Sequence, residues 1–270
     1  MTSNPVLAID SVSGAGGAVI DVESVSKAYG HVTALSNVSC QVHPGEVVAL
    51  VGDNGAGKST LMKVMCGVIQ PDEGRVTVQG RDLPRHGAIV LSEYGVGVVY
   101  QDLALAPDLS VHENFFLGNE PTRSGFLGAL GFLDRKRMAA ECRAALDRLG
   151  IKTLKSVEVE LASLSGGQRQ SVAIARAVNW ASSAVVMDEP TAALGVHQTQ
   201  LVGDMIKSIS ARGIAVLLIS HDMPAVLELA DRILVMRHGR LVADLRAAEA
   251  DIPQIVSAML GSTDVKSEEA

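Results

Sequence analysis

A glycine-rich loop between an apolar segment and a helical pattern constrains the fold of this chain more than any other feature. Residues 47–51 are all apolar, and a helix-like pattern extends from Lys58 to about Cys66. The loop matches G-x-x-x-x-G-K-S/T and comprises Gly52, Asp53, Asn54, Gly55, Ala56, Gly57, Lys58, Ser59 and Thr60. A strand, a glycine loop and a helix in this order are typical of phosphate-binding sites. A plain glycine turn before a helix is the alternative, and the strand before it disfavours that interpretation.

The residue types in the loop fit a nucleoside triphosphate bound together with Mg²⁺. Glycines let backbone N–H groups surround phosphate oxygens, because no Cβ stands in the way. The N-terminus of the following helix adds the positive end of its dipole. We expect Lys58 to contact the β- and γ-phosphates and the Ser59 hydroxyl to ligate Mg²⁺.

Strand-like and helical patterns alternate along most of the chain. We expect strands at residues 19–25, 32–42, 47–51, 74–79, 96–100, 184–187, 214–219 and 233–236. Helical patterns occupy residues 58–66, 110–117, 134–149, 165–179 and 196–211. Hydrophobic residues make up 47% of the chain and aromatic residues 3%, so Val, Ala, Leu and Ile must build the core. Together these patterns predict an α/β fold with a mostly parallel sheet.

Two adjacent carboxylates, Asp188 and Glu189, directly follow the apolar residues 185–187. Ligands of open α/β sheets bind beyond the carboxyl ends of the strands, which is where we expect these side chains. We predict that Asp188 helps to hold Mg²⁺ and that Glu189 orients and polarises the attacking water. A solvated turn is the alternative, and the phosphate loop in the same chain favours the functional interpretation.

Three further side chains follow predicted strands. His221 comes after residues 214–219 and Ser220, and we predict that it senses the γ-phosphate. Gln101 comes after residues 96–100, from where it can reach the metal or the water. Tyr29 lies just past the first predicted strand, where it either stacks on adenine or packs at the sheet edge.

A second set of residues with the chemistry of an anion site opens a later predicted helix. The set consists of Ser165, Gly166, Gly167 and Gln168, which place a hydroxyl and two glycines at the helix N-terminus. Either it binds a second anion, or it closes over a nucleotide held by another copy of the chain. A capped helix start with flexible glycines is the alternative.

Taken together, these residues resemble the motifs of the ATP-binding cassette (ABC) family. Residues 52–60 are similar to its Walker A loop, residues 185–189 to its Walker B strand and residues 164–168 to its signature. Gln101 and His221 match its Q-loop and switch histidine. All five motifs occur in the family's order, and the resemblance extends from residue 19 to about residue 245.

The resemblance implies a P-loop NTPase of the ABC type. Such a fold has a mostly parallel sheet core, an N-terminal antiparallel β region and an inserted α-helical subdomain. We expect a flexible leader at residues 1–18, an ATP-binding domain at 19–250, and a C-terminal helix and tail at 251–270. The domain divides into a core, residues 19–101 and 182–250, and a helical subdomain, residues 102–181.

The resemblance also implies an ATPase that couples hydrolysis of MgATP to transport of a solute across a membrane. Two cassettes of that family form a head-to-tail dimer, so residues 165–168 would contact the ATP of the partner subunit. We therefore expect a homodimer bound to integral-membrane permease subunits at the cytoplasmic face of the inner membrane. A periplasmic solute-binding protein is an indirect partner, and no nucleic acid is expected.

A narrower resemblance, on residues 52–67, 100–105 and 191–195, is to the single-cassette ATPases of bacterial monosaccharide importers. The alternatives are another importer, an exporter or a lipid transporter, because those cassettes share all five motifs. A soluble ABC ATPase of DNA repair or translation is a remote alternative, because it would need a coiled-coil insertion or a second cassette. Gly195 departs from the family, which commonly has an Asp there for a contact between the two sites.

Charge and cysteine content exclude several other classes. The 23 Lys and Arg against 30 Asp and Glu give a net charge of −7, which argues against a protein that follows a nucleic-acid backbone. The longest apolar runs are far shorter than a membrane-spanning helix needs. Cys40, Cys66 and Cys142 show no C-x-x-C spacing, and we expect them to be small buried apolar residues.

Two apolar segments of the helical region have more than one interpretation. Residues 103–109 with Phe115 and Phe116 form either the face that docks on the permease or the core of the helical region. Residues 125–133 are uncharged, apolar and too short to span a membrane. We expect them to form a packed loop in preference to a membrane contact.

Overall fold

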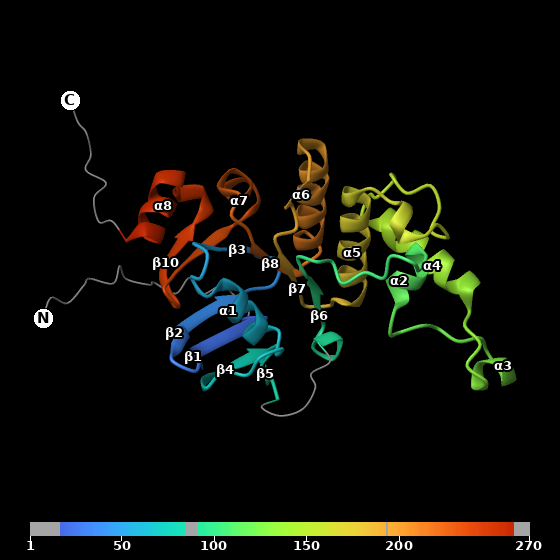
Figure 1. The fold of residues 1–270 in the computed structure, drawn as a ribbon, viewed down its shortest axis with the longest axis horizontal. Coiled ribbons are helices and arrows are strands. Elements are labelled where there is room, and N and C mark those ends of the chain that lie inside the picture. The colour runs from blue at the N-terminus through green and yellow to red at the C-terminus, as the bar shows by residue number, and fades with distance from the viewer. Residues whose placement is uncertain (1–16, 85–90, 193, 262–270) are drawn as a thin grey trace, which may run out of the picture.

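The computed structural model describes residues 17–84, 91–192 and 194–261, which form two β-sheets flanked by helices (Figure 1). Residues 1–16 of the predicted leader and residues 262–270 of the predicted tail lie outside this described part. Within it, no helix is long and apolar enough to cross a membrane.

The larger sheet has six strands in the order β10-β9-β3-β8-β7-β6. Its strands are β3 (Val47–Gly52), β6 (Val96–Val99), β7 (Ala184–Asp188), β8 (Ala215–Ile219), β9 (Arg232–Arg237) and β10 (Arg240–Arg246). All neighbours from β9 to β6 pair in parallel, and β10 pairs antiparallel with β9. Every residue of β3 and β8 is buried, as helices on both faces of a parallel sheet require. The predicted fold class, with its mostly parallel core, is confirmed.

The smaller sheet is antiparallel and has the order β2-β1-β4-β5. It contains β1 (Ile20–Tyr29), β2 (Val32–Val42), β4 (Glu73–Val78) and β5 (Arg81–Asp82). The sequence alternation predicts a first strand that ends at Val25, but β1 continues to Tyr29. Register shifts before and after Val25 interrupt the alternation without ending the pairing with β2. Tyr29 is therefore the last residue of β1, which corrects its predicted place beyond the strand.

The helices fall into two groups along the chain. Four of them, α2 to α5, follow one another between β6 and β7 and occupy one end of the molecule, at the right of Figure 1. They are α2 (Val111–Phe116), α3 (Phe126–Ala129), α4 (Arg135–Arg148) and α5 (Gly166–Trp180). The other helices are α1 (Lys58–Met65), α6 (Val196–Ser210), α7 (Met223–Leu229) and α8 (Ile252–Leu260). Short 3₁₀ turns are η1 (Leu91–Tyr94), η2 (Leu161–Ser163) and η3 (Ala247–Glu249).

The α2–α5 region has an aromatic core of its own. Ser110 begins α2 with a capping box that involves Glu113, and this fixes the helix that carries Phe115 and Phe116. Both phenylalanines are buried, and Phe116 meets Trp180 of α5 edge to face at 6.1 Å between ring centroids. Of the two interpretations of this aromatic pair, the core is therefore correct. In residues 103–109, Leu103 and Leu105 pack partly buried against the same core.

Residues 125–133 do not form the packed loop that their composition predicts. They contain α3 and a following turn at the far end of the helical region (Figure 1). Phe126 is 77% exposed and Leu130 is 58% exposed. Four of its backbone N–H groups, those of residues 129–132, donate to carbonyl oxygens of the same segment, which closes the chain on itself. The packed-loop prediction is wrong because backbone closure, not burial of side chains, shapes this segment.

The three cysteines are free and buried, as predicted. Burial raises the pKa of Cys40, Cys66 and Cys142 to about 12 in each case. The thiols therefore stay protonated at neutral pH and act as small apolar residues.

Candidate functional site

Adjacent parallel strands bring four of the predicted motifs to one edge of the larger sheet. β3 and β8 pair Leu50 with Ile219, and β7 and β8 pair Asp188 with Ile219. β6 lies next to β7, with Val99 opposite Met187. The residues at these strand ends are therefore neighbours, although up to 169 positions separate them in the chain. They are the loop after β3, His221 after β8, Asp188 and Glu189 at the end of β7, and Gln101 after β6.

Two glycines of the loop after β3 have no room for a side chain. Gly52 has φ +152°, and a Cβ there would collide with the carbonyl oxygen of Met236 on β9. Gly57 has φ +104°, and a Cβ there would lie 2.6 Å from the Ala34 carbonyl oxygen. Both positions need glycine because the loop is left-handed and pressed against neighbouring backbone. This packing gives the loop one defined shape before any ligand binds.

The Lys58 side chain folds back across this loop. Its Nζ donates to the Gly52 carbonyl oxygen at 2.6 Å and to the Asp53 carbonyl oxygen at 3.0 Å. The ammonium group thus lies over the concave side of the loop, which is where a phosphate would replace the carbonyls as its partner. Asp53, Asn54, Gly55 and Ser59 are exposed, Thr60 is half-buried, and Ala56 is buried beneath the loop.

Asp188 is a half-buried carboxylate that faces positive charge from α1. Burial raises its pKa above the ordinary value and the Glu189 carboxylate raises it further, while Lys58 and Lys63 act in the opposite direction. The interaction with Lys58 places Asp188 within electrostatic reach of the loop. A carboxylate and the Ser59 hydroxyl are hard oxygen donors, which is the ligand type that Mg²⁺ prefers. Among the described residues no cluster of three or more His, Cys, Asp or Glu forms a larger metal site.

Glu189 and His221 are in direct contact. His221 Nδ1 lies 2.7 Å from Glu189 Oε2, and the Glu189 backbone N–H donates to the Ile219 carbonyl oxygen at 2.9 Å. Glu189 has φ +51°, an unusual conformation for a residue other than glycine. Because a carboxylate can only accept, the histidine carries its hydrogen on Nδ1 in this contact. The pair joins the ends of β7 and β8 at the same edge as the loop.

Gln101 is exposed in the turn after β6, and an arginine of the helical region holds this turn in place. Arg176 of α5 donates to the carbonyl oxygens of Ala104 at 2.8 Å and Leu103 at 3.0 Å. Leu103 and Ala104 both have positive φ, so the arginine holds a strained turn. Sequence analysis missed Arg176, although an arginine between Ala175 and Ala177 in an apolar stretch of helix is a signal that could have found it.

Tyr29 ends β1 with 47% of its surface exposed, and the Lys27 ammonium lies 5.9 Å from its ring centroid. The exposed ring has room for a stacking partner. Its partner across the smaller sheet is Val32.

The Ser165–Gln168 set caps α5. Ser165 Oγ accepts from the Gln168 backbone N–H, and the Gln168 side-chain oxygen accepts from the Ser165 backbone N–H at 3.0 Å. Gln168 also donates to the Thr153 carbonyl oxygen. The hydrogen bonds described for this set join it to residues of the helical region, and none of them joins it to residues 52–60.

Gly195 begins α6, and Gln198 links this helix start to the set at α5. The Gln198 side chain accepts from the Gly195 backbone N–H at 3.0 Å. Its carbon atoms lie so close to Gly167 that a Cβ there would be 2.8 Å away. The segment that contains the unusual glycine is therefore packed directly against the second predicted anion site.

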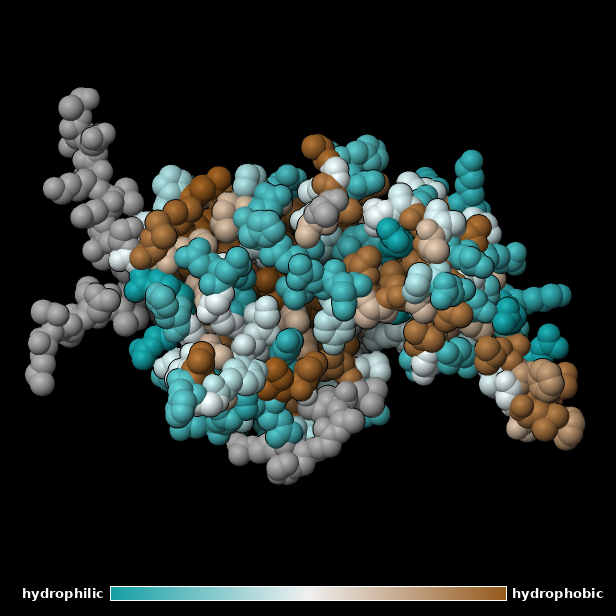
Figure 2. All heavy atoms as spheres, in the orientation of Figure 1, coloured by the Kyte–Doolittle hydropathy of each residue, from teal (hydrophilic) through white to brown (hydrophobic). Residues whose placement is uncertain are grey.

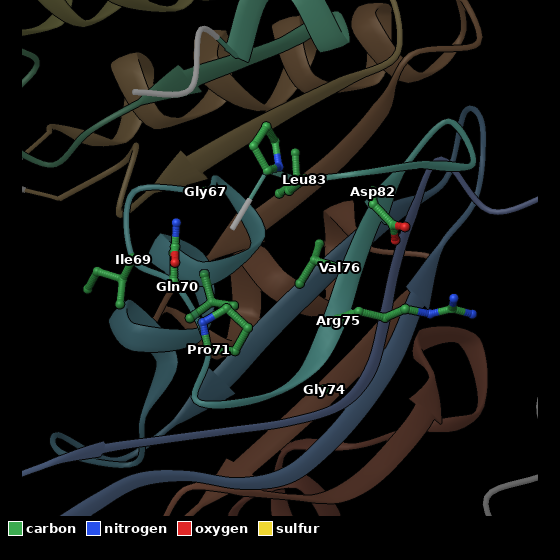
Figure 3. A pocket seen from close by; sticks show the side chains of 11 residues that line it. Gly67, Ile69, Gln70, Pro71, Gly74, Arg75, Val76, Asp82 and Leu83 are labelled. Carbon is green, nitrogen blue, oxygen red and sulfur yellow. The ribbon is translucent and has the colours of Figure 1, made fainter. Parts of the chain in front are cut away.

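A cavity of about 460 Å³ lies away from these residues, beside β4 and the end of α1 (Figure 3). Its lining includes Ile69, Pro71, Arg75 and Asp82. Arg75 is the one cation among the described lining residues, and Glu23 engages it at 2.8 Å. The open phosphate loop, rather than this cavity, has the chemistry of a nucleotide site.

The chain is similar in sequence to known proteins. A family model described as ABC transporter matches residues 35–192. The fructose import ATP-binding protein FrcA of Rhizobium meliloti is 40% identical, and the alignment covers 91% of this chain and 95% of FrcA. The xylose/arabinose import ATP-binding protein XylG of Sulfolobus acidocaldarius is 38% identical, with 89% and 93% covered. The ribose import ATP-binding protein RbsA 2 of Burkholderia pseudomallei is 41% identical over 90% of this chain, which spans 46% of that relative.

The solved structures with a similar fold are described as ATP-binding cassettes. A nucleotide-free ATP-binding cassette from an ABC transporter superimposes with a TM-score of 0.72 at 28% identity, covering 92% of this chain and 96% of that one. The ADP conformation of such a cassette gives 0.74 at 28% identity, with 92% and 96% covered. A dimeric post-hydrolysis cassette bound to ADP and Pi gives 0.68 at 27% identity, with 84% and 98% covered.

Proposed function

The chain belongs to the ABC transporter family, and we propose that it is the ATP-hydrolysing, energy-coupling subunit of a bacterial importer for a monosaccharide. The observation that carries this proposal is the common sheet edge, where the loop after β3, Asp188, Glu189, His221 and Gln101 follow neighbouring strands. Relatives named for import of fructose, xylose or arabinose, and ribose support the sugar class.

ATP binds in this proposal with its phosphates in the loop of residues 52–60. Lys58 exchanges the Gly52 and Asp53 carbonyls for the β- and γ-phosphate oxygens, and backbone N–H groups of the loop and of the α1 N-terminus surround them. The exposed ring of Tyr29 stacks on the adenine.

The Ser59 hydroxyl, the Asp188 carboxylate and the Gln101 side chain would hold Mg²⁺. When bound, the ion neutralises charge that develops on the β- and γ-phosphates. The half-buried position of Asp188 keeps competing water away from one side of this site. Arg176 holds the turn after Gln101 in the conformation that presents Gln101 to the proposed metal site.

Hydrolysis depends on Glu189 as the residue that orients and polarises the attacking water. His221 holds the Glu189 carboxylate at 2.7 Å in the described conformation, so a γ-phosphate that attracts His221 would also move Glu189. This gives His221 a sensing and positioning role, while Lys58 and Gln101 complete the catalytic set.

A second copy of the chain completes each site. Ser165, Gly166, Gly167 and Gln168 would contact the ATP of the partner subunit in a head-to-tail homodimer, because their described contacts leave the phosphate loop of their own chain untouched. Gly195 lacks a side chain for a contact across this dimer, and Gln198 is the residue that joins its backbone to the Gly167 region.

The chain would work as a peripheral subunit at the cytoplasmic face of the inner membrane. Residues 19–101 and 182–250 form the core and residues 102–181 the helical subdomain of one ATP-binding domain. The partially exposed residues 103–109 remain as the docking face for the integral-membrane permease, since Phe115 and Phe116 are buried. A periplasmic solute-binding protein would deliver the sugar to that permease.

Reconstitution tests the proposed function. The chain is purified with the permease encoded beside its gene and placed in proteoliposomes with the matching binding protein. ATP hydrolysis should rise when a monosaccharide is supplied and should stay at the basal rate with an amino acid or a peptide. Stimulation by a solute that is not a sugar would contradict the proposed substrate class.

A further inference from the structure

The turn between β9 and β10 lies against the phosphate loop of residues 52–60. The Gly239 backbone N–H in this turn donates to the Ala56 carbonyl oxygen at 2.9 Å. β9 also pairs with β3, which places Met236 opposite Gly52, and a Cβ at Gly52 would collide with the Met236 carbonyl oxygen. The turn and the loop are therefore fixed to each other, because paired strands of the larger sheet carry both.

The opposite side of the same turn contacts β2 of the smaller sheet. The Gly239 carbonyl oxygen accepts from the Ser36 backbone N–H at 2.8 Å. Gly239 has φ +73°, and a Cβ there would lie 2.7 Å from the Ala34 carbonyl oxygen. The position needs glycine because its backbone is left-handed and because β2 fills the space of a side chain. Gly239 thus joins the phosphate loop to β2 through one N–H and one carbonyl group.

The phosphate loop itself reaches the same point of β2. A Cβ at Gly57 would lie 2.6 Å from the Ala34 carbonyl oxygen, so Gly57 and Gly239 both press against this one oxygen. The smaller sheet lies below β3 and β10 in Figure 1, and Figure 2 shows that the atoms of the two sheets meet without an open gap on this face. We call this contact of the two sheets the junction; it consists of Gly57, Gly239, Ala34 and Ser36.

β2 connects the junction to the tyrosine that is proposed to stack on the adenine. Val32 lies two residues before Ala34, roughly 7 Å along the strand, and it pairs with Tyr29 on β1. The Tyr29 side chain and the phosphate loop therefore come from different sheets. Their separation depends on how β2 is held at the junction.

We propose that Gly239 is a positioning residue for the nucleotide, which holds β2 and the Tyr29 ring at the distance from the phosphate loop that one ATP molecule spans. A side chain at position 239 would displace β2 and not the loop, since the larger sheet fixes the loop to the turn. The adenine and the phosphates would then no longer reach both of their contacts at once. Affinity for ATP would fall while binding of the phosphates alone persisted.

The positioning role of Gly239 deepens the proposed function and rests on its placement of ATP in the loop and against Tyr29. The two contacts can be measured apart, because magnesium tripolyphosphate presents the phosphates without a base. Tyr29→Ala should lower the affinity for ATP by about tenfold, a usual contribution of a stacked base, and should leave the affinity for tripolyphosphate unchanged. Lys58→Ala should abolish binding of both ligands.

Gly239→Ala tests the junction directly. Titration calorimetry should show about fivefold weaker binding of ATP, with tripolyphosphate affinity within about twofold of the parent. In a Tyr29→Ala background the same substitution should cost no further ATP affinity, because the ring that it positions is absent.

A second glycine provides the matched control. Gly80 in the turn between β4 and β5 has φ +71°, and nothing lies within 4 Å of its Cβ position. Gly80→Ala therefore carries the backbone strain of Gly239→Ala without the contact with β2. Both affinities of this variant should remain at the parent values.

Ser36→Pro tests the junction from β2 and does not depend on whether Gly239→Ala folds. β2 is an edge strand, where proline is tolerated, and the substitution removes the N–H that donates to Gly239. ATP affinity should again fall by about fivefold, with tripolyphosphate affinity kept.

The pattern of the two affinities decides between the outcomes. Equal losses for ATP and tripolyphosphate in the Gly239 and Ser36 variants would overturn the positioning role, because the junction would then act on the phosphate loop. Unchanged ATP affinity in these variants, or in Tyr29→Ala, would overturn it as well, and binding by the phosphate loop would still stand. A parent chain that binds neither ligand would instead contradict the proposed function, and the positioning role with it.

Discussion

His221 Nδ1 lies 2.7 Å from Glu189 Oε2, so a histidine two residues beyond β8 holds the carboxylate that directly follows β7. The His221 side chain is 74% exposed and the Glu189 side chain 16%. The carboxylate is therefore the more buried member of the pair and the imidazole the more exposed one. Because the two side chains share one contact, substitutions at either residue must affect the other.

Glu189→Gln should keep ATP binding and lose most hydrolysis. The amide preserves shape but cannot polarise water, and loss of a general base costs about 100-fold or more in turnover. Phosphate release at saturating MgATP is the measurement, with Glu228→Gln, an exposed partner of Lys207, as the control. His221→Ala should also slow turnover, and the double variant should be no slower than the worse single variant. Unchanged turnover in Glu189→Gln would remove Glu189 from its proposed role.

Lys58→Ala should abolish nucleotide binding. The substitution removes the charge that lies over the loop at 2.6 Å from the Gly52 carbonyl oxygen, and nothing else described there replaces it. Titration calorimetry with ATP measures the loss, and Lys207→Ala at an exposed position of α6 should retain the parent affinity. Unaltered ATP affinity of Lys58→Ala would contradict the assignment of residues 52–60 as the phosphate-binding loop.

Asp188→Asn should stabilise the nucleotide-free protein at neutral pH while abolishing metal-dependent hydrolysis. Burial and the Glu189 charge raise the Asp188 pKa above its ordinary value of 3.8, so the ionised carboxylate is less favourable in the folded than in the unfolded chain. This cost appears as the pH rises from 3.8 through the folded pKa and persists above it. The Tm of Asp188→Asn should thus exceed that of the parent at pH 7, and the difference should shrink as the pH falls. Equal Tm values at pH 7 would show that the ionised Asp188 carboxylate does not destabilise the folded chain.

Arg176→Met should slow hydrolysis by about tenfold and leave ATP affinity nearly unchanged. The substitution removes two hydrogen bonds that hold the carbonyls of Leu103 and Ala104, so the turn that presents Gln101 loses its support. Arg143 is the matched control, because it donates to the Leu154 carbonyl in the same region at a distance from Gln101. The kcat and KM of both variants are measured separately. If Arg143→Met changes them as much as Arg176→Met does, the effect is a general loss of stability and not a loss of support for Gln101.

The sequence predicts well which segments meet at one edge of the larger sheet, because residues 52–60, Gln101, Asp188 and His221 each lie at or just beyond the end of an apolar strand. Strand β2 occupies the predicted residues 32–42, and α1 begins at Lys58 as expected. Capping residues give the helix starts, since Ser110, Asp134 and Ser165 all cap the helices that they were expected to begin.

What the sequence misses depends on contacts between distant residues. β10 has too many polar residues to read as a strand, yet pairing with β9 through the His238–Gly239 turn forms it. Arg176 gains its role from a turn more than 70 residues earlier in the chain. Residues 125–133 are apolar in sequence, and only the folded structure shows that most of their large side chains stay outside the core.

Two copies of this chain share each ATP site in the proposed homodimer, and light scattering of Glu189→Gln with ATP tests this sharing most directly. The variant should bind ATP without consuming it, so the closed pair should accumulate. We predict a mass near twice 28.2 kDa with ATP and 28.2 kDa without it, and Ser165→Arg in the same background should prevent the increase. A strictly monomeric protein at saturating ATP would contradict the shared site.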